Sequence, residues 1–252
     1  MKPALHSPQG VAALHRLLHR PALLAFDFDG TLAPICKDPK DARTPASWHA
    51  HLTLINRHWP IAVISGRQMA DLAPRVGFEP AFLVGNHGAE STMTNARIPS
   101  MGSLDAARRL LASQRVPIDA LGVEVEDKGM SLAVHYRRAS RASVASAFVD
   151  RLLRCLPPDL SVSKGKAVFN ITVSAAPDKG DALRSAMHAS GVAHALFVGD
   201  DSNDEAAFAA ASPGSVTVRI GTRFAPTHAR FALATQRQLG QLLRTLARHC
   251  RR

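Results

Sequence analysis

The sequence has few cysteines, few aromatic residues and no long apolar run, and each shortage excludes a class of protein. Cys36, Cys155 and Cys250 are far apart and form no Cys-x-x-Cys pair, so we expect no structural disulfide and a reducing, cytoplasmic setting. No apolar stretch reaches the roughly 18 residues that cross a membrane. Histidines and arginines interrupt the first apolar run, so we expect no secretory signal.

Aromatic residues make up 5% of the chain, with one tyrosine, which leaves few rings on which nucleic-acid bases can stack. The formal net charge is +11, which suits nucleic-acid binding only where the charge is concentrated. The basic residues are spread along the chain without a basic tract. We therefore expect a small anionic partner, no nucleic acid and no membrane, and we assume a monomer. A generally basic amino-acid usage explains the charge equally well.

The two ends of the chain alternate short apolar runs with helical periodicity. Such runs have the length of parallel strands buried on both faces, and their alternation with helices predicts a doubly wound, Rossmann-like α/β core. The expected core strands are residues 22–28, 61–64, 81–84, 195–198 and 216–220. The expected core helices are residues 11–19, 46–58, 68–76, 180–190, 203–211 and 239–246.

Between residues 102 and 176 the pattern changes, because the apolar residues now alternate with polar ones. Alternation of this kind is typical of an antiparallel sheet with one face in water. We expect strands at 122–125, 131–137 and 168–173 and helices at 104–111 and 143–153. The sequence thus predicts two domains, a core formed by residues 1–101 and 177–252 and an inserted α/β domain of residues 102–176.

Two carboxylates follow the first predicted strand, in the motif Phe26-Asp27-Phe28-Asp29-Gly30-Thr31-Leu32. Open α/β sheets bind ligands at this end of their strands, and Gly30 lets the chain leave the strand sharply. Asp27 and Asp29 repel each other at such short spacing, and a divalent cation such as Mg²⁺, which prefers oxygen ligands, relieves that repulsion. The alternative is a polar turn without a ligand.

A second acidic motif, Gly199-Asp200-Asp201-Ser202-Asn203-Asp204-Glu205, follows the predicted strand 195–198. Capping a helix needs one acidic or polar side chain, whereas this turn has four acidic ones. Metal binding explains the excess. The alternative is a solvated helix start that interacts favourably with the helix dipole.

Two weaker motifs lie at other predicted strand or helix ends. Ser65-Gly66-Arg67 offers a hydroxyl and backbone N–H groups to a phosphate, and Lys179-Gly180 offers a positive charge. Taken alone, Ser65 is better explained as an ordinary helix cap and Lys179 as an ordinary surface lysine.

In this order the four motifs, from about residue 22 to 235, resemble those of the haloacid dehalogenase (HAD) superfamily of phosphatases. The resemblance implies a phosphomonoester hydrolase in which Asp27 is the nucleophile and Asp29 the general acid and base. Ser65 and Lys179 would then hold the phosphoryl group. The position of the insert resembles a C2-type cap. A catalytically inactive regulatory subunit is disfavoured because every catalytic position is filled.

The same resemblance implies a Mg²⁺ site. The implied ligands are Asp27, Asp29 and Asp200. Asp201 and Asp204 would not bind the metal themselves and would orient these ligands or Lys179.

Three further strings resemble trehalose-6-phosphate phosphatases: Gly85-Asn86-His87-Gly88-Ala89-Glu90, Glu126-Asp127-Lys128-Gly129-Met130 running into His135-Tyr136-Arg137, and Lys164-Gly165-Lys166. They imply hydrolysis of trehalose 6-phosphate to trehalose and phosphate. The implied substrate-binding residues are Gly30, Arg67, His87, Gly88, Glu126, Lys128 and Lys166.

Other interpretations of these strings stay open. Another capped sugar phosphatase, acting on sucrose phosphate or mannosyl-3-phosphoglycerate, is the main alternative. Glu126 and Lys128 also suit an exposed turn pair that contributes little, and residues 135–137 suit ordinary alternating strand positions. Asn170 stands where the family pattern has an acid.

Overall fold

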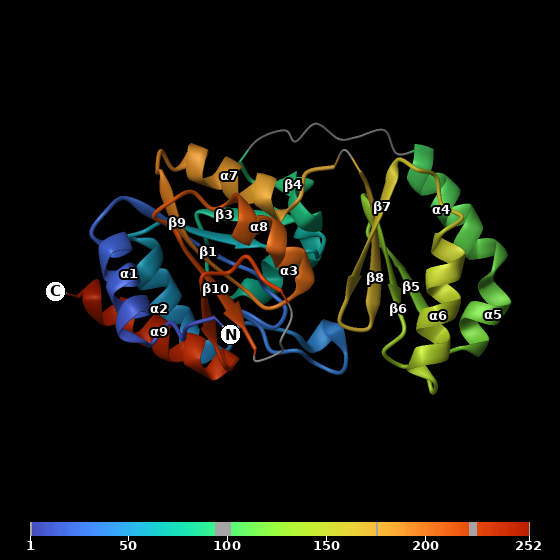
Figure 1. Ribbon diagram of the computed structural model, residues 1–252, viewed down its shortest axis with the longest axis horizontal. Coiled ribbons are helices and arrows are strands. Elements are labelled where there is room, and N and C mark those ends of the chain that lie inside the picture. The colour runs from blue at the N-terminus through green and yellow to red at the C-terminus, as the bar shows by residue number, and fades with distance from the viewer. Residues whose placement is uncertain (1, 94–101, 175, 222–225, 252) are drawn as a thin grey trace. The chain divides into compact units, whose positions relative to one another are not determined.

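The computed structural model describes residues 2–93, 102–174, 176–221 and 226–251. Internal contacts divide the chain into two units, a core unit of Met1–Ala96 with Pro177–Arg252 and an insert unit of Arg97–Ala176 (Figure 1). The predicted domain boundary at residue 101 falls within residues 94–101, outside the described residues, and stays a prediction. Within the described ranges, no helix is long and apolar enough to cross a membrane.

The core unit contains a seven-stranded sheet in the order β11-β10-β9-β1-β2-β3-β4. Every neighbouring pair is parallel except β3 and β4, which are antiparallel. The strands are β1 (Ala22–Phe26), β2 (Ile61–Ile64), β3 (Phe82–Gly85), β4 (Glu90–Ser91), β9 (His194–Gly199), β10 (Val216–Ile220) and β11 (Phe231–Leu233).

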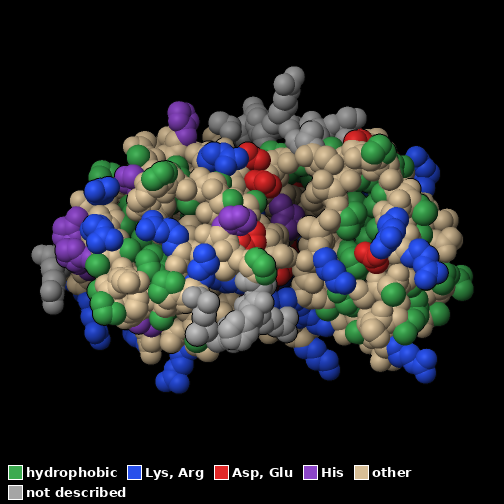
Figure 2. Space-filling model, in the orientation of Figure 1, with side chains coloured by type: hydrophobic (Ala, Val, Ile, Leu, Met, Phe, Trp, Pro, Cys, Tyr) green, Lys and Arg blue, Asp and Glu red, His purple; other side chains and the backbone are tan. Residues whose placement is uncertain are grey.

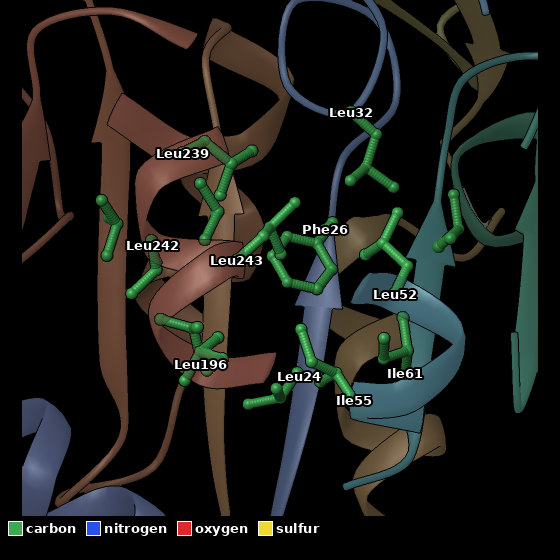
Figure 3. Packing of buried hydrophobic residues seen from close by; sticks show 14 of the residues in the cluster. Leu24, Phe26, Leu32, Leu52, Ile55, Ile61, Leu196, Leu239, Leu242 and Leu243 are labelled. Carbon is green, nitrogen blue, oxygen red and sulfur yellow. The ribbon is translucent and has the colours of Figure 1, made fainter. Parts of the chain in front are cut away.

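Helices pack on both faces of this sheet. Alternate side chains of β1 show the two-sided burial, since Leu24 and Phe26 pack with Leu52 and Leu243 on one face (Figure 3), whereas Leu23 faces the opposite cluster. The first cluster includes α1 (Pro8–Leu18), α2 (Ala46–Asn56), α3 (Met69–Val76) and α9 (Gln236–His249), and the second includes α7 (Lys179–Ala189) and α8 (Glu205–Ala210). The predicted doubly wound α/β core is therefore confirmed.

The insert unit has a four-stranded antiparallel sheet in the order β5-β6-β8-β7. Its strands are β5 (Glu124–Asp127), β6 (Ser131–His135), β7 (Leu160–Gly165) and β8 (Val168–Val173). One face packs against α4 (Gly102–Ser113), α5 (Arg115–Ala120) and α6 (Ala142–Leu153) (Figure 1). Leu132, Val134, Phe169 and Ile171 are buried on that face. The opposite face carries polar side chains such as Glu126 and Asn170, as the apolar–polar alternation predicts.

The sequence missed several short elements. β7 joins β8 through a two-residue turn in which Ala167 has φ 63°. Turns of this kind usually carry glycine or asparagine at such a position, so alanine gave no indication of the turn. α5 contains Pro117, and β4 and β11 are only two and three residues long. The helix predicted at 203–211 begins as a 3₁₀ turn, Ser202–Asp204, before α8. Two further 3₁₀ turns are Pro39–Asp41 and Asn86–Gly88.

On the face shown in Figure 2, lysine and arginine side chains are scattered over each unit and do not form one dominant patch.

Candidate active site

Asp27 and Asp200 come together because each directly follows a central strand. β1 and β9 are parallel neighbours, and the N–H of Asp27 donates to the carbonyl of Val198 at 2.9 Å. Gly30, with φ 90°, turns the chain after β1. A Cβ at Gly30 would lie 2.2 Å from Oδ2 of Asp200, so only glycine permits both the turn and this approach.

Asp204 completes a group of three buried carboxylates with Asp27 and Asp200, and one oxygen of each lies within 4.8 Å of the others. Oδ2 of Asp204 accepts the N–H groups of Asp200 at 2.8 Å and Asp201 at 2.9 Å. A Cβ at Gly199 would lie 2.4 Å from the Asp204 side chain, so the bare backbone there admits the carboxylate. Three convergent carboxylate oxygens fit a hard divalent cation, so this group is a candidate metal site.

Lys179 enters the same group from the start of α7. The helix begins with a capping box in which Asp178 accepts the N–H of Asp181 at 2.9 Å, while Asp181 accepts the N–H of Asp178 at 3.0 Å. Nζ of Lys179, whose side chain is 1% exposed, donates to Oδ1 of Asp27 and to Oδ1 of Asp204, both at 2.6 Å. The ammonium group therefore fixes the nucleophile candidate and the third carboxylate relative to each other.

The charges in this group do not balance. Burial raises the pKa of Asp27, Lys179 opposes that effect, and Asp204 and Asp200 raise the pKa further, so it lies well above its ordinary value. Burial by itself lowers the pKa of Lys179, but Asp204 and Asp27 outweigh burial and hold that pKa above its ordinary value. Lys179 is thus the one cation in contact with this group among the described residues, and a metal ion bound there would add positive charge.

The side chain of Asp29 lies apart from the three-carboxylate group. Its two oxygens accept hydrogen bonds from Nε and Nη2 of Arg67, each at 2.7 Å. The Asp29 side chain is 37% exposed. The structure therefore groups Asp204, and not the side chain of Asp29, with Asp27 and Asp200. The roles predicted for Asp29 in metal binding and proton transfer stay predictions.

Ser65 lies buried at the end of β2, where its Oγ accepts the N–H of Arg67 at 3.2 Å. Its carbonyl accepts the N–H of His87 at 2.9 Å, which brings the turn after β3 alongside. The His87 ring covers Gly66, where a Cβ would lie 2.4 Å from the ring. Ser65, Arg67 and His87 thus share one place at the carboxyl end of the sheet.

Sequence reasoning missed what holds this turn. Asn86 and His87 both have left-handed backbone conformations, with φ 47° and 60°. Glu90 fixes them, because Oε1 accepts Nδ2 of Asn86 at 2.7 Å and Oε2 accepts the N–H of Met69 at 2.5 Å. Gly88, with φ 128°, passes so close to Asp178 that a Cβ would lie 2.7 Å from its carbonyl oxygen. The sequence motif at residues 85–90 contains the residues that form and hold this turn, so it was the available signal for it.

The predicted substrate-binding residues of the insert unit lie in two parts of its sheet, one at β5 and one at the turn between β7 and β8. Glu126 lies on β5, where Oε2 is 2.9 Å from Nε2 of His135 and 3.8 Å from Nζ of Lys128. Lys128 is in the turn after β5, and its side chain is only 11% exposed. Lys166 is in the turn between β7 and β8, and its carbonyl accepts Nη2 of Arg137 at 3.1 Å. The pair of Glu126 and Lys128 is therefore a strand residue and a turn residue, not two turn residues.

Asn170 lies in the middle of the same sheet, opposite Ala133 on β6 and Ser163 on β7. Glu126 is opposite Ala133 from the other side, so Asn170 and Glu126 share a face of the sheet. Tyr136, by contrast, packs on Phe169 with ring centroids 5.6 Å apart.

The doubly wound core with paired aspartates after β1, a lysine after the insert and an acidic turn after β9 has the architecture of the HAD class with a C2-type insert. A solved HAD subclass IIB sugar phosphatase shares this fold, with a TM-score of 0.60 and 15% identity, over 90% of this chain and 98% of that one. Within this class the chain belongs to the trehalose-phosphatase family, whose family model matches residues 25–237. The resemblance seen in the sequence is thus confirmed.

Two further comparisons agree. The chain is 35% identical over 201 residues to a trehalose-phosphate phosphatase of Mycolicibacterium paratuberculosis, an alignment that covers 76% of this chain and 51% of that protein. The chain therefore spans about half the length of this relative. The C-terminal domain of C. albicans trehalose-6-phosphate phosphatase has the same fold, with a TM-score of 0.84 and 23% identity, over 98% of both chains.

Proposed function

We propose that this chain hydrolyses trehalose 6-phosphate to trehalose and phosphate through an aspartyl phosphate on Asp27. The observation that carries the proposal is the position of Asp27, buried at the carboxyl end of β1 and hydrogen-bonded to Lys179 beside Asp200 and Asp204. Membership of the trehalose-phosphatase family supports the choice of substrate.

In the first step a carboxylate oxygen of Asp27 attacks phosphorus and the bond to the sugar oxygen breaks. Nζ of Lys179 is hydrogen-bonded to Oδ1 of Asp27, so we assign the attack to Oδ2. Asp29 protonates the departing sugar alkoxide, and for this step one of its oxygens carries a proton in addition to accepting an Arg67 N–H group. Asp27 and Asp200, with Asp204 beside them, would hold a Mg²⁺ ion here, and the ion would supply positive charge that offsets the repulsion between the phosphate dianion and the carboxylates. The metal-binding role predicted for Asp29 stays a prediction.

In the second step Asp29 accepts a proton from the water that attacks the aspartyl phosphate, which releases phosphate and restores Asp27. The hydroxyl of Ser65 and the ammonium of Lys179 stabilise the charge on the phosphoryl oxygens. Lys179 is already oriented by Asp204, so little reorganisation is needed when that charge develops.

The sugar is recognised by charged and amide side chains of the insert unit. Charge-assisted hydrogen bonds are the strong ones, and Glu126 accepts such bonds from hydroxyl groups while Lys128 and Lys166 donate them. Asn170 donates and accepts without charge. On the core unit, His87 and the backbone at Gly30 and Gly88 complete the proposed binding residues.

We place the enzyme in the cytoplasm as a monomer. The three cysteines support a reducing compartment, because no disulfide joins them in the described part of the chain and Cys155 is exposed. Size-exclusion chromatography with light scattering tests the oligomeric state, and a dimer would contradict this part of the proposal.

The test is phosphate release from trehalose 6-phosphate, sucrose 6-phosphate and glucose 6-phosphate, each with Mg²⁺ or with EDTA. We expect trehalose 6-phosphate to give the highest kcat/KM, activity to vanish with EDTA, and Mg²⁺ to restore it. Asp27→Asn should abolish turnover, and Asp29→Asn should lower it by about 10²–10⁴-fold.

Asp150→Asn is the matched control, because it removes one carboxylate charge from an exposed ion pair with Arg154 on α6. Its activity should equal that of the wild type. Near-normal turnover by Asp27→Asn would refute the mechanism, and a preference for another sugar phosphate would refute the substrate.

A further inference from the structure

The guanidinium group of Arg67 uses four of its five N–H donors in hydrogen bonds to protein acceptors. Nε and Nη2 donate to the two oxygens of Asp29, Nη1 donates to Oδ2 of Asp71, and Nη2 also donates to the carbonyl of Pro39, all at 2.7 Å. The guanidinium carbon lies 5.5 Å from the ring centre of Phe28. Because a guanidinium is planar, contacts on its edges and on its face fix its orientation completely.

Arg67 is 9% exposed, so its N–H groups depend on these protein acceptors. Phe28 and Asp29 both belong to the turn after β1, whereas Asp71 belongs to the first turn of α3. Arg67 therefore ties the carboxylate of Asp29 to a helix that has no other role in the proposed chemistry. The pair is bidentate, and this geometry fixes direction as well as distance.

Asp71 is itself held between two arginines at helical spacing, Arg67 four residues before it and Arg75 four residues after it. Oδ1 of Asp71 accepts Nη2 of Arg75 at 2.5 Å and Nε at 3.0 Å. Arg75 also donates to the carbonyl of Lys40, near the end of the segment that leads from β1 to α2. Hence four charged side chains, Arg75, Asp71, Arg67 and Asp29, form one continuous hydrogen-bonded row.

We propose that Arg67 and Asp71 are positioning residues for Asp29, with Asp71 orienting Arg67 and Arg67 orienting the carboxylate that transfers protons. The proposal rests on the proposed function, in which Asp29 acts as acid and base. It differs from the substrate-binding role that the resemblance assigns to Arg67. A substrate ligand sets KM, whereas a residue that only orients Asp29 sets the rate of proton transfer and therefore kcat.

Leaving groups of different basicity separate positioning from a purely structural effect. A sugar alkoxide is a strong base and needs its proton in the transition state, whereas a nitrophenolate leaves without one. Misplacing the acid therefore slows poor leaving groups more than good ones. Substituted phenyl phosphates give such a series and carry no sugar, so recognition of the sugar does not affect the comparison.

The experiment measures the single-turnover rate of phenol release along this series for the wild type, Asp71→Asn, Asp71→Glu and Asp150→Asn. Asp150 and Arg154 form an exposed ion pair with the same four-residue spacing, so Asp150→Asn controls for loss of a helical ion pair. We expect Asp71→Asn to slow the most basic leaving group at least about threefold more than the least basic one, since small misplacements of a catalytic group are costly. Asp71→Glu should recover part of that loss.

With trehalose 6-phosphate, Asp71→Asn should lower kcat and leave KM unchanged. A raised KM with unchanged kcat would overturn the proposal and return Arg67 to the substrate. Equal slowing of all leaving groups, or the same behaviour as Asp150→Asn, would also overturn it. A wild type without activity on any phosphate ester would instead refute the proposed function, and this inference with it.

A double-mutant cycle keeps the test decisive if Asp71→Asn is less stable. In an Asp29→Asn background, Asp71→Asn should cause no further loss of single-turnover rate, because the group that it positions is already gone. If the two losses multiply, Asp71 acts independently of Asp29 and the proposal is wrong.

Discussion

Gly30 and Asp200 approach so closely that a methyl group on Gly30 would lie 2.2 Å from the Asp200 carboxylate. A side chain at position 30 would therefore displace the Asp200 carboxylate or the turn after β1. This contact connects the two acidic motifs, which are about 170 residues apart in the sequence.

Gly30→Ala should lower kcat/KM by at least about tenfold, because the methyl group displaces Asp200 and a 1 Å misplacement is costly. Gly191→Ala is the matched control, since Gly191 also has a positive φ, 64°, but nothing lies within 4 Å of the position that a Cβ would take there. Both variants should lose about 1–2 kcal/mol of stability from backbone strain. Equal activity of the two variants would show that the contact with Asp200 does not matter.

Lys179→Met should leave Asp27 and Asp204 buried without their shared cation. Removing one partner of a buried ion pair typically costs about 3–5 kcal/mol, so we expect a clear loss of stability in urea unfolding as well as loss of activity. Mg²⁺ should stabilise this variant more than the wild type, because the metal replaces part of the missing charge. A variant with unchanged stability in EDTA would contradict the burial and pairing described for Lys179.

The acid stability of the insert unit should depend on Asp127. Hydrogen bonds from Arg108, opposed by weak desolvation, hold the pKa of Asp127 below its ordinary value of 3.8. A carboxyl group with a lowered folded-state pKa contributes stability above its unfolded pKa and loses that contribution as the pH falls through the folded pKa. Asp127→Asn should therefore be less stable than the wild type at pH 7, and the difference should shrink below about pH 4. A constant difference from pH 7 to pH 2.5 would contradict this account.

Much of the core could be predicted because its physics is local. Residues 22–26 are apolar at successive positions because β1 is buried on both faces, and the acids that follow mark its carboxyl end. The sequence extended that strand two residues too far, since Asp27 and Phe28 already belong to the turn. The helix at 46–58 and the strand at 61–64 needed little correction.

Some relations between side chains could not be predicted, because they depend on contacts between distant segments. Asp204 was expected to orient the metal ligands or Lys179, and its hydrogen bonds to Lys179 and to the N–H of Asp200 fit that expectation, which stays a prediction. Arg67 was predicted to bind the substrate, which stays a prediction, but its pairing with Asp29, 38 residues earlier in the chain, was not predicted. This pairing has no local sequence signal, since it requires the register of neighbouring strands.

Selectivity for the sugar should reside in the insert unit. Glu126→Ala, Lys128→Ala or Lys166→Ala should lower kcat/KM for trehalose 6-phosphate by at least about tenfold, or about 1.4 kcal/mol. Turnover of p-nitrophenyl phosphate should fall much less, because that ester has no sugar hydroxyls. Arg115→Ala is the control, since it removes an exposed charge on α5. If all three variants lost both activities equally, these residues would not read the sugar.

The most direct test of the central claim is to trap the phosphorylated enzyme. Rapid acid quenching of the wild type after mixing with ³²P-labelled trehalose 6-phosphate and Mg²⁺ should leave label on the peptide that contains Asp27, and mild base should release it as acyl phosphates do. Asp27→Asn should carry no label. Full turnover by the wild type with no label on Asp27, or with label on another residue, would contradict the mechanism.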